Sequence, residues 1–270
     1  MRQGFNVDDS DTHVNPAADV LDRYVDPSFR ARLSELEPYR QQFGQTAQGS
    51  AKLQQYRVGT KFYRRILGTS DPDSEFTGRG ANWQGSKPAR PHVQDDAPEN
   101  RVMDMDDEGS DVHLLIPTGW SSVVGLDDPT LEVGLIQAYH CYMVDFCGQF
   151  PERLKGLIVA STRNVDEAVH DIQQWGRSKW VVAMLPLLDM DMPADHPDLE
   201  PIWQAAQAHD LAIANHSLTW NPPYFPDLWE NIFLGRLTSH PWGAMRFIAA
   251  FIGAGMMDRY PDRRPHNCSQ

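Results

Sequence analysis

Short apolar runs alternate with longer stretches of helical periodicity over much of the chain. Four apolar runs predict strands, and they lie at residues 111–117, 153–161, 179–188 and 211–218. The stretches that predict amphipathic helices lie at residues 98–109, 128–150, 164–176 and 199–210. A fifth strand is predicted near the N-terminus, within residues 5–15. Strands that alternate with helices at this spacing predict a parallel sheet with crossover helices.

End signals support several of these helices. Gly109 is expected to close the first of them. Asn164, with Glu167 three residues later, forms a capping pattern in which the Asn164 side chain accepts from amides of the first turn. A further apolar stretch, residues 247–257, is predicted to be a buried helix, too short to span a bilayer.

Two architectures accommodate about five strands of this kind. One is a doubly wound sheet, and the other is the first part of an eight-stranded (β/α) barrel. The first strand runs into "DTHVNP" and not into a Gly-x-Gly-x-x-Gly loop, which weakens the dinucleotide-binding alternative. We expect one domain over residues 1–270, with an irregular insertion at residues 26–98 and an atypical tail at residues 263–270.

Charge and cysteine usage exclude some classes of partner. The chain has 270 residues, 41% of them hydrophobic, and a formal net charge of −13. Such a charge repels phosphates, so neither nucleic acid nor an anionic membrane is expected as a partner, whereas a small-molecule substrate is. The three cysteines form no Cys-x-x-Cys pair, which fits a reducing compartment. No signal peptide is recognisable at the N-terminus, and a cytoplasmic protein is therefore expected.

Three residues at strand ends are candidate metal ligands. Asp11 and His13 are two apart at the end of the first strand, where residues i and i+2 project to the same side. His216 lies at the end of another predicted strand. A carboxylate and two imidazoles are ligands that a divalent metal ion takes, and in a parallel barrel all three would meet at the carboxyl end of the strands. Taken singly, Asp11 could cap a turn and His216 could be a hydrogen-bonded core residue.

Other polar residues have more ordinary explanations. Trp220 could form the wall of a substrate pocket or act as a packing anchor, and His240 could bind substrate or cap and pack at a helix start. Cys141 and Cys147, six apart, do not share a helix face. The residues expected to be surface or packing groups within amphipathic helices are His140, His170 and His209.

Several segments resemble one family. "DSDTHVNP" is similar to the first-strand metal motif of the amidohydrolase superfamily, in the amidohydrolase-related branch that includes aminocarboxymuconate-semialdehyde decarboxylase and the resorcylate decarboxylases. "NRVMDMDDEGSDVHLLIP" and "FCGQFPERLKGLIVAS" resemble the approaches to the second and third strands of that branch, and "LAIANHSL" resembles its fifth strand. "SHPWGAMRFIAAFIGAGMMDRYPD" resembles the helix that comes next.

The resemblance implies a (β/α)8 barrel of the TIM type. It implies a divalent metal held by Asp11, His13 and His216, most simply zinc, with manganese or iron as alternatives. The implied activity is metal-dependent hydrolysis or non-oxidative decarboxylation of a small aromatic or carboxylated substrate, with the metal as Lewis acid. Decarboxylation is slightly favoured by the branch, and a homodimer is expected from the same relatives.

The sequence departs from the family after Asp262. The family continues into three more strands, the last of which carries a catalytic Asp in a Ser-Asp-Tyr-Pro-like motif, whereas here "RRPHNCSQ" predicts no apolar strand. The expectation is an incomplete, C-terminally truncated barrel with two unpaired edges. The alternative function is therefore a catalytically inactive homologue, either a metal-binding remnant or an interaction protein.

Overall fold

The structure, a computed structural model, describes residues 4–43, 53–56, 97–117, 126–189, 192–216, 232–261 and 265–267. Its main element is a parallel sheet of six strands in the order β1-β4-β5-β6-β7-β8. The strands are β1 (Asp8–Val14), β4 (Val112–Pro117), β5 (Leu154–Ser161), β6 (Val181–Leu187), β7 (Ala212–Asn215) and β8 (Pro265–Asn267). The five predicted strands are confirmed, and each ends close to its expected position.

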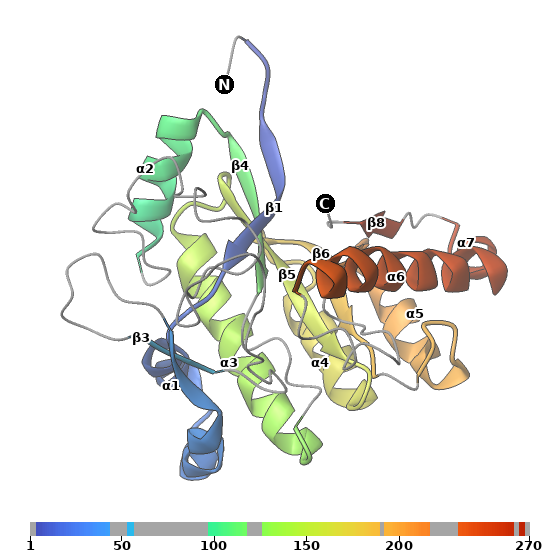
Figure 1. Ribbon diagram of the computed structural model, residues 1–270, viewed down its shortest axis with the longest axis horizontal. Coiled ribbons are helices and arrows are strands. Elements are labelled where there is room, and N and C mark those ends of the chain that lie inside the picture. The colour runs from blue at the N-terminus through green and yellow to red at the C-terminus, as the bar shows by residue number, and fades with distance from the viewer. Residues whose placement is uncertain are drawn as a thin grey trace.

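The strand order selects one of the two architectures left open. A doubly wound sheet reverses its order at a switch point, whereas here the strands of the main sheet follow one another with no reversal. The sheet also curls (Figure 1), and the end of β1 approaches the end of β7 although three strands separate them. Progressive order together with this curvature is the geometry of an incomplete TIM barrel.

One strand of the main sheet lies where the hydropathy pattern predicts none. β8 pairs with β7 through the register Ile213↔Pro265 to Asn215↔Asn267. The structure therefore adds a sixth, three-residue strand to the five that were predicted. Pairing at a sheet edge uses main-chain N–H and C=O groups, so a short polar segment can join without an apolar pattern.

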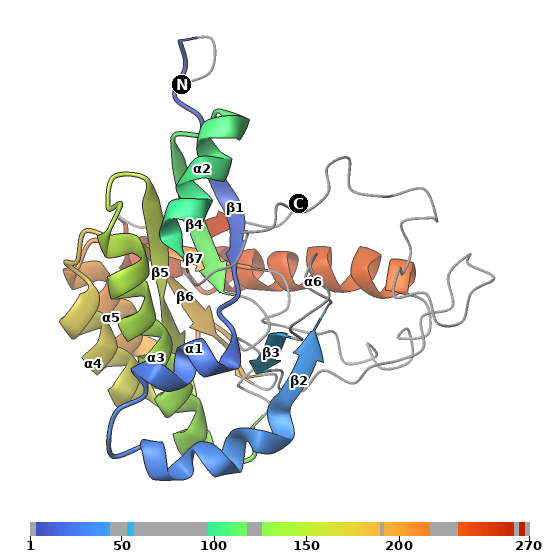
Figure 2. The ribbon, with the colours of Figure 1, turned by 90° about the vertical axis from the view of Figure 1, so that its left-hand side faces the viewer.

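Four helices follow the predicted pattern. They are α2 (Pro98–Glu108), α3 (Pro129–Gly148), α4 (Val165–Trp175) and α5 (Glu200–Ala208), the last preceded by the short 3₁₀ helix η3 (Pro197–Leu199). The helices α3, α4 and α5 lie together on the outer face of the sheet (Figure 2). Gly109 ends α2 in the left-handed conformation, with a φ of 81°, as expected.

The capping pattern predicted at Asn164 is wrong. Asn164 occupies the N-cap of α4, but its side chain makes no capping hydrogen bond. Its Nδ2 instead donates to the carbonyl of Pro129 over 3.1 Å. The side chain thus ties the start of α4 to the start of α3, and this tertiary contact replaces the local one.

The apolar stretch at residues 247–257 spans two helices. α6 (Ile232–Gly253) ends within it, and α7 (Met256–Arg259) follows after Gly255, which has a φ of 67°. Phe247 and Phe251 are buried, but Ile252 is 64% exposed, so the prediction of a buried helix holds for one face only. No helix in the described part of the chain is both long enough and apolar enough to cross a membrane.

The segment after β1 contains regular elements. They are α1 (Ala18–Tyr24), the 3₁₀ helix η1 (Arg30–Tyr39) and a separate antiparallel hairpin of β2 (Arg40–Phe43) and β3 (Leu53–Tyr56). Tyr56 is buried and donates to Asp22 Oδ1 over 2.6 Å, and Arg40 pairs with both side chains. This cluster fixes the hairpin against α1.

Candidate metal centre

The first strand brings Asp11 and His13 together. Its register against β4 shifts between Asp9 and Thr12, so one extra residue is accommodated as a β-bulge. Asp11 lies within this bulge, and its Oδ1 is 3.8 Å from His13 Nε2. The main chain of His13 is anchored as well, because Arg101 of α2 donates to its carbonyl over 2.7 Å.

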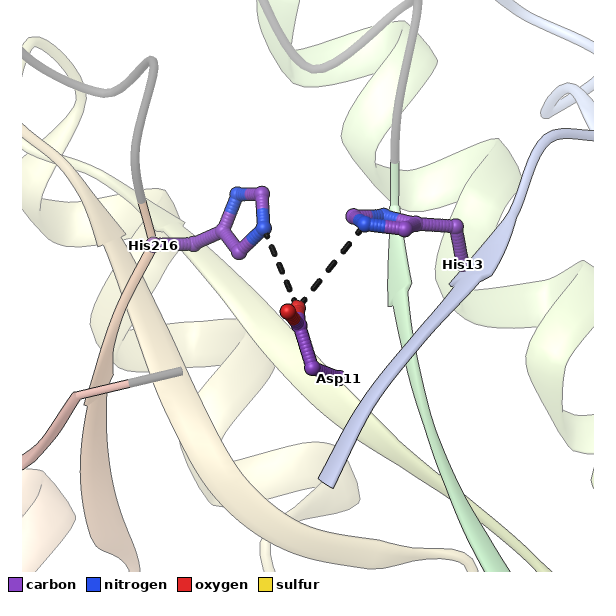
Figure 3. A group of neighbouring side chains, drawn as sticks. All are labelled: Asp11, His13 and His216. Atoms are coloured by element: carbon purple, nitrogen blue, oxygen red, sulfur yellow. Dashed lines mark ion pairs between the residues drawn. The ribbon is translucent and has the colours of Figure 1, made fainter. Parts of the chain in front are cut away.

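The third side chain comes from the far side of the curled sheet. His216 follows β7 directly, and its Nε2 lies 3.5 Å from Asp11 Oδ1 (Figure 3). The His13 and His216 rings have centroids 5.0 Å apart and meet at 75°. Only 10% of the His216 side chain is exposed, compared with 43% for His13. Asp11, His13 and His216, called the metal cluster below, therefore have a buried side and an open side.

The geometry of the metal cluster is compatible with a divalent metal ion. Each side chain offers one ligand atom, and the three atoms lie within 4.8 Å of one another. Two ligand atoms that each lie about 2.1 Å from an ion, at a tetrahedral angle to one another, are about 3.4 Å apart. The distances from Asp11 Oδ1 to the two imidazole nitrogens, 3.5 and 3.8 Å, are close to this value. That oxygen is buried and has no hydrogen-bond partner in the described part of the chain. A bound cation would supply the partner that this oxygen lacks.

The two predicted substrate-binding residues cannot be placed at the metal cluster. Trp220 falls outside the described residues. His240 lies in the interior of α6, which begins at Ile232, so the expectation of a helix start at His240 is wrong. The side chain of His240 is outside the described set as well.

The helix histidines have the structural roles expected of them. His140 is fully buried: its Nε2 accepts from the Val159 amide over 2.9 Å, and its Nδ1 lies 3.2 Å from Asp171 Oδ2. His209 Nδ1 lies 2.9 Å from the carbonyl four residues earlier, at the end of α5. His170 is exposed on α4. None of these three rings belongs to the metal cluster.

One polar pair between α3 and the end of β5 is not indicated by the sequence pattern. Glu132, in the first turn of α3, is fully buried, and its Oε2 lies 3.4 Å from Arg163 Nη1, just after β5. Burial is the largest cause that raises the pKa of Glu132, and the Asp189 carboxylate adds to it. The hydrogen bond from the Ser161 hydroxyl and the charge of Arg163 act in the opposite direction, but the pKa of Glu132 remains raised. In the sequence, Glu132 is an ordinary acidic residue at a helix start, so no signal distinguishes it.

Sequence and structure comparisons with known proteins have different outcomes. No family model matches the sequence, and no curated protein matches it. Solved structures do match. The 5-carboxyvanillate decarboxylase LigW from Sphingomonas paucimobilis aligns with a TM-score of 0.54 and 21% identity, over 67% of this chain and 55% of that chain. The chain shares the fold of this decarboxylase.

Two further matches cover almost the whole chain. The manganese-bound 5-carboxyvanillate decarboxylase LigW2 from Novosphingobium aromaticivorans, with 3-methoxy-4-hydroxy-5-nitrobenzoic acid, has a TM-score of 0.59 and 16% identity, over 98% of this chain and 66% of that chain. An amidohydrolase from Mycobacterium avium subsp. paratuberculosis has a TM-score of 0.63 and 14% identity, over 98% of this chain and 72% of that chain. The chain thus spans 55% of the length of LigW and 66% of the length of LigW2.

Proposed function

We propose that this chain carries the metal-binding part of a metal-dependent decarboxylase that acts on a small aromatic carboxylate. The observation that carries the proposal is the convergence of Asp11, His13 and His216 from opposite sides of a curled parallel sheet. Structures of the same fold support it, because two of them are 5-carboxyvanillate decarboxylases and one of these holds manganese with a nitrobenzoic acid.

The residues of this chain have separable tasks in the proposed reaction. The Asp11 carboxylate and the two imidazoles hold the ion, and the exposed side of His13 leaves room for a substrate to approach. When bound, the ion supplies Lewis acidity, which polarises a substrate oxygen or lowers the pKa of a water molecule. In the decarboxylation the bond between the ring and the carboxyl carbon breaks, carbon dioxide leaves, and the ring carbon takes up a proton.

Metal-dependent hydrolysis is the second candidate reaction. An amidohydrolase is among the structures of the same fold, and the same three ligands would serve to activate water for attack on an amide or ester. The assay must therefore distinguish release of carbon dioxide from release of an amine or alcohol.

Zinc is the ion that we propose for the site, with manganese or iron as alternatives. Two imidazoles and one carboxylate form a ligand set found in catalytic zinc sites. Manganese prefers oxygen-rich surroundings, but it is the ion present in a structure of the same fold. Zinc should bind more tightly than manganese or iron whichever ion is the native one, so turnover by the chain loaded with each ion in turn decides between them.

The activity test uses the metal-loaded full chain with a panel of hydroxybenzoates in deuterated water. Decarboxylation predicts carbon dioxide release with one deuterium at the ring carbon that lost the carboxylate, observed by NMR. Metal bound in a one-to-one ratio without turnover of carboxylates, amides or esters would instead support the inactive metal-binding homologue. A chain that binds none of the three ions would overturn the proposed function.

Two further expectations belong with this proposal. We infer a cytoplasmic protein, supported by the cysteine usage, and a homodimer by analogy with the family it resembles. Sedimentation velocity of the purified chain at several concentrations measures the second directly.

A further inference from the structure

The strand that carries Asp11 contains a feature that the proposed function leaves unexplained. Between Asp9↔His113 and Thr12↔Leu115, β1 advances three residues while β4 advances two. The two intervening residues of β1 therefore lie opposite a single residue of β4. Such bulges re-aim side chains, and they leave main-chain groups outside the ladder.

The bulge reverses the alternation of the strand at the candidate ligand. Asp9 is in register with His113, which is buried 3.9 Å from Glu108 of α2, so Asp9 belongs to the face of the sheet on which α2 lies. In a regular strand Asp11, two residues later, would share that face. Instead the Asp11 carboxylate points between the two imidazoles of the metal cluster (Figure 3).

Two side chains satisfy main-chain groups at the bulge. The Asp11 amide donates to Asp9 Oδ1 over 3.0 Å, and the Thr12 hydroxyl donates to the carbonyl of Leu114 over 2.9 Å. Asp side chains commonly accept from the main chain two residues on, and Asn side chains do so as well. Two side chains outside the metal cluster thus hold the Asp11 amide and tie the next residue of β1 to β4.

We propose that Asp9 and Thr12 are positioning residues for the metal site. They hold the bulge, and the bulge turns the Asp11 carboxylate toward His216. The inference rests on the proposed function for its metal, but the bulge itself can be measured without one. Each hydrogen bond stabilises the bulge relative to a regular strand, so losing either side chain favours a register in which Asp11 turns away.

The test compares matched variants of the full chain. Asp9→Ala removes both the acceptor and the charge, Asp9→Asn keeps the acceptor, and Asp8→Ala removes the same charge from the exposed neighbour. Thr12→Val removes the hydroxyl at nearly constant volume, and Thr12→Ser keeps it. Zinc affinity is measured by competition with a chromophoric chelator, and protection of the Asp11 amide in the metal-free chain is measured by NMR hydrogen exchange.

Loss of either hydrogen bond should weaken the site. We expect Asp9→Ala and Thr12→Val to weaken zinc binding by about tenfold, as for residues that orient a ligand. Asp9→Asn, Asp8→Ala and Thr12→Ser should stay close to the wild type. The Asp11 amide should exchange faster in Asp9→Ala and at the original rate in Asp9→Asn.

Several outcomes would overturn the inference. If Asp9→Ala binds zinc as tightly as Asp8→Ala does, and its Asp11 amide is still protected from exchange, Asp9 does not hold the bulge. If Thr12→Val and Thr12→Ser bind zinc equally tightly, the Thr12 hydroxyl does not hold the bulge. If Asp9→Asn is as weak as Asp9→Ala, charge and not the hydrogen bond is responsible. If the wild type binds no zinc, manganese or iron, the proposed function fails, whereas the exchange rates of the Asp11 amide still decide whether Asp9 holds the bulge.

Discussion

His216 Nε2 lies 3.5 Å from Asp11 Oδ1, although the strands that position these residues are separated by three others in the sheet. A flat sheet would hold β1 and β7 about 19 Å apart, four strand spacings of about 4.8 Å. Curvature of the sheet closes that gap. The contact is therefore a direct measure of how far this sheet has curled toward a barrel.

Replacing His216 tests whether this contact serves a metal. His216→Asn keeps a polar side chain but removes the imidazole ligand, and we expect metal affinity to fall by at least about 100-fold, beyond the effect of residues that only orient a ligand. His170→Asn, on the exposed side of α4, should leave affinity close to that of the wild type. Isothermal calorimetry with zinc and with manganese measures both. Equal affinities in the two variants would remove His216 from the ligand set.

The buried His140–Asp171 pair predicts a large stability effect without a change in metal binding. Because Val159 donates to Nε2, the ring carries its proton on Nδ1, which faces Asp171 Oδ2. Asp171→Ala removes the carboxylate that faces this buried N–H, and we expect a loss of about 3 kcal/mol in the free energy of unfolding. Chemical denaturation measures it, with Asp166→Ala on the exposed face of α4 as control. A loss below about 1 kcal/mol would show that water replaces the carboxylate.

Glu132 predicts a pH dependence of stability. Its pKa is raised in the folded state from an ordinary 4.5, so the folded chain holds this proton to higher pH than the unfolded chain does. The contribution of Glu132 to the free energy of unfolding is therefore fully present at pH values below its ordinary pKa. It is lost as the pH rises through the pKa of the folded state. We expect Glu132→Gln to gain stability relative to the wild type across that window.

Urea denaturation of the wild type and Glu132→Gln at matched pH values, from about 4.5 upward to about 8, checks this prediction. Glu152→Gln, which removes an exposed carboxylate, controls for the loss of one charge. A difference between Glu132→Gln and the wild type that stays constant with pH would mean that the Arg163 ion pair at least offsets the effect of burial on the pKa of Glu132.

Cys147 should resist alkylation in the native chain. Its side chain is fully buried, and burial raises the pKa of the thiol to about 12. At a pH of about 8 the thiolate, which is the reactive form, is then only about one part in ten thousand. Iodoacetamide labelling followed by peptide mass spectrometry should modify the partly exposed Cys141 before Cys147, which should react only after denaturant is added. Equal labelling rates would indicate that α3 opens readily.

The sequence by itself determined the elements and the identity of the candidate ligands. Apolar runs and helical spacing depend on local chain geometry, which is why the ends of β4, β5 and β6 are close to their predicted positions. Asp11, His13 and His216 were recognisable because each is a ligand type at a strand end.

Only the tertiary structure decided how these parts meet. The hydrogen bond from Asn164 to Pro129 and the burial of Glu132 both depend on neighbours far away in the chain. The curl that brings the end of β7 to the end of β1 likewise accumulates from the twist between successive strands. No local pattern encodes these relationships, because each is set by packing between elements and not by the residues of one element.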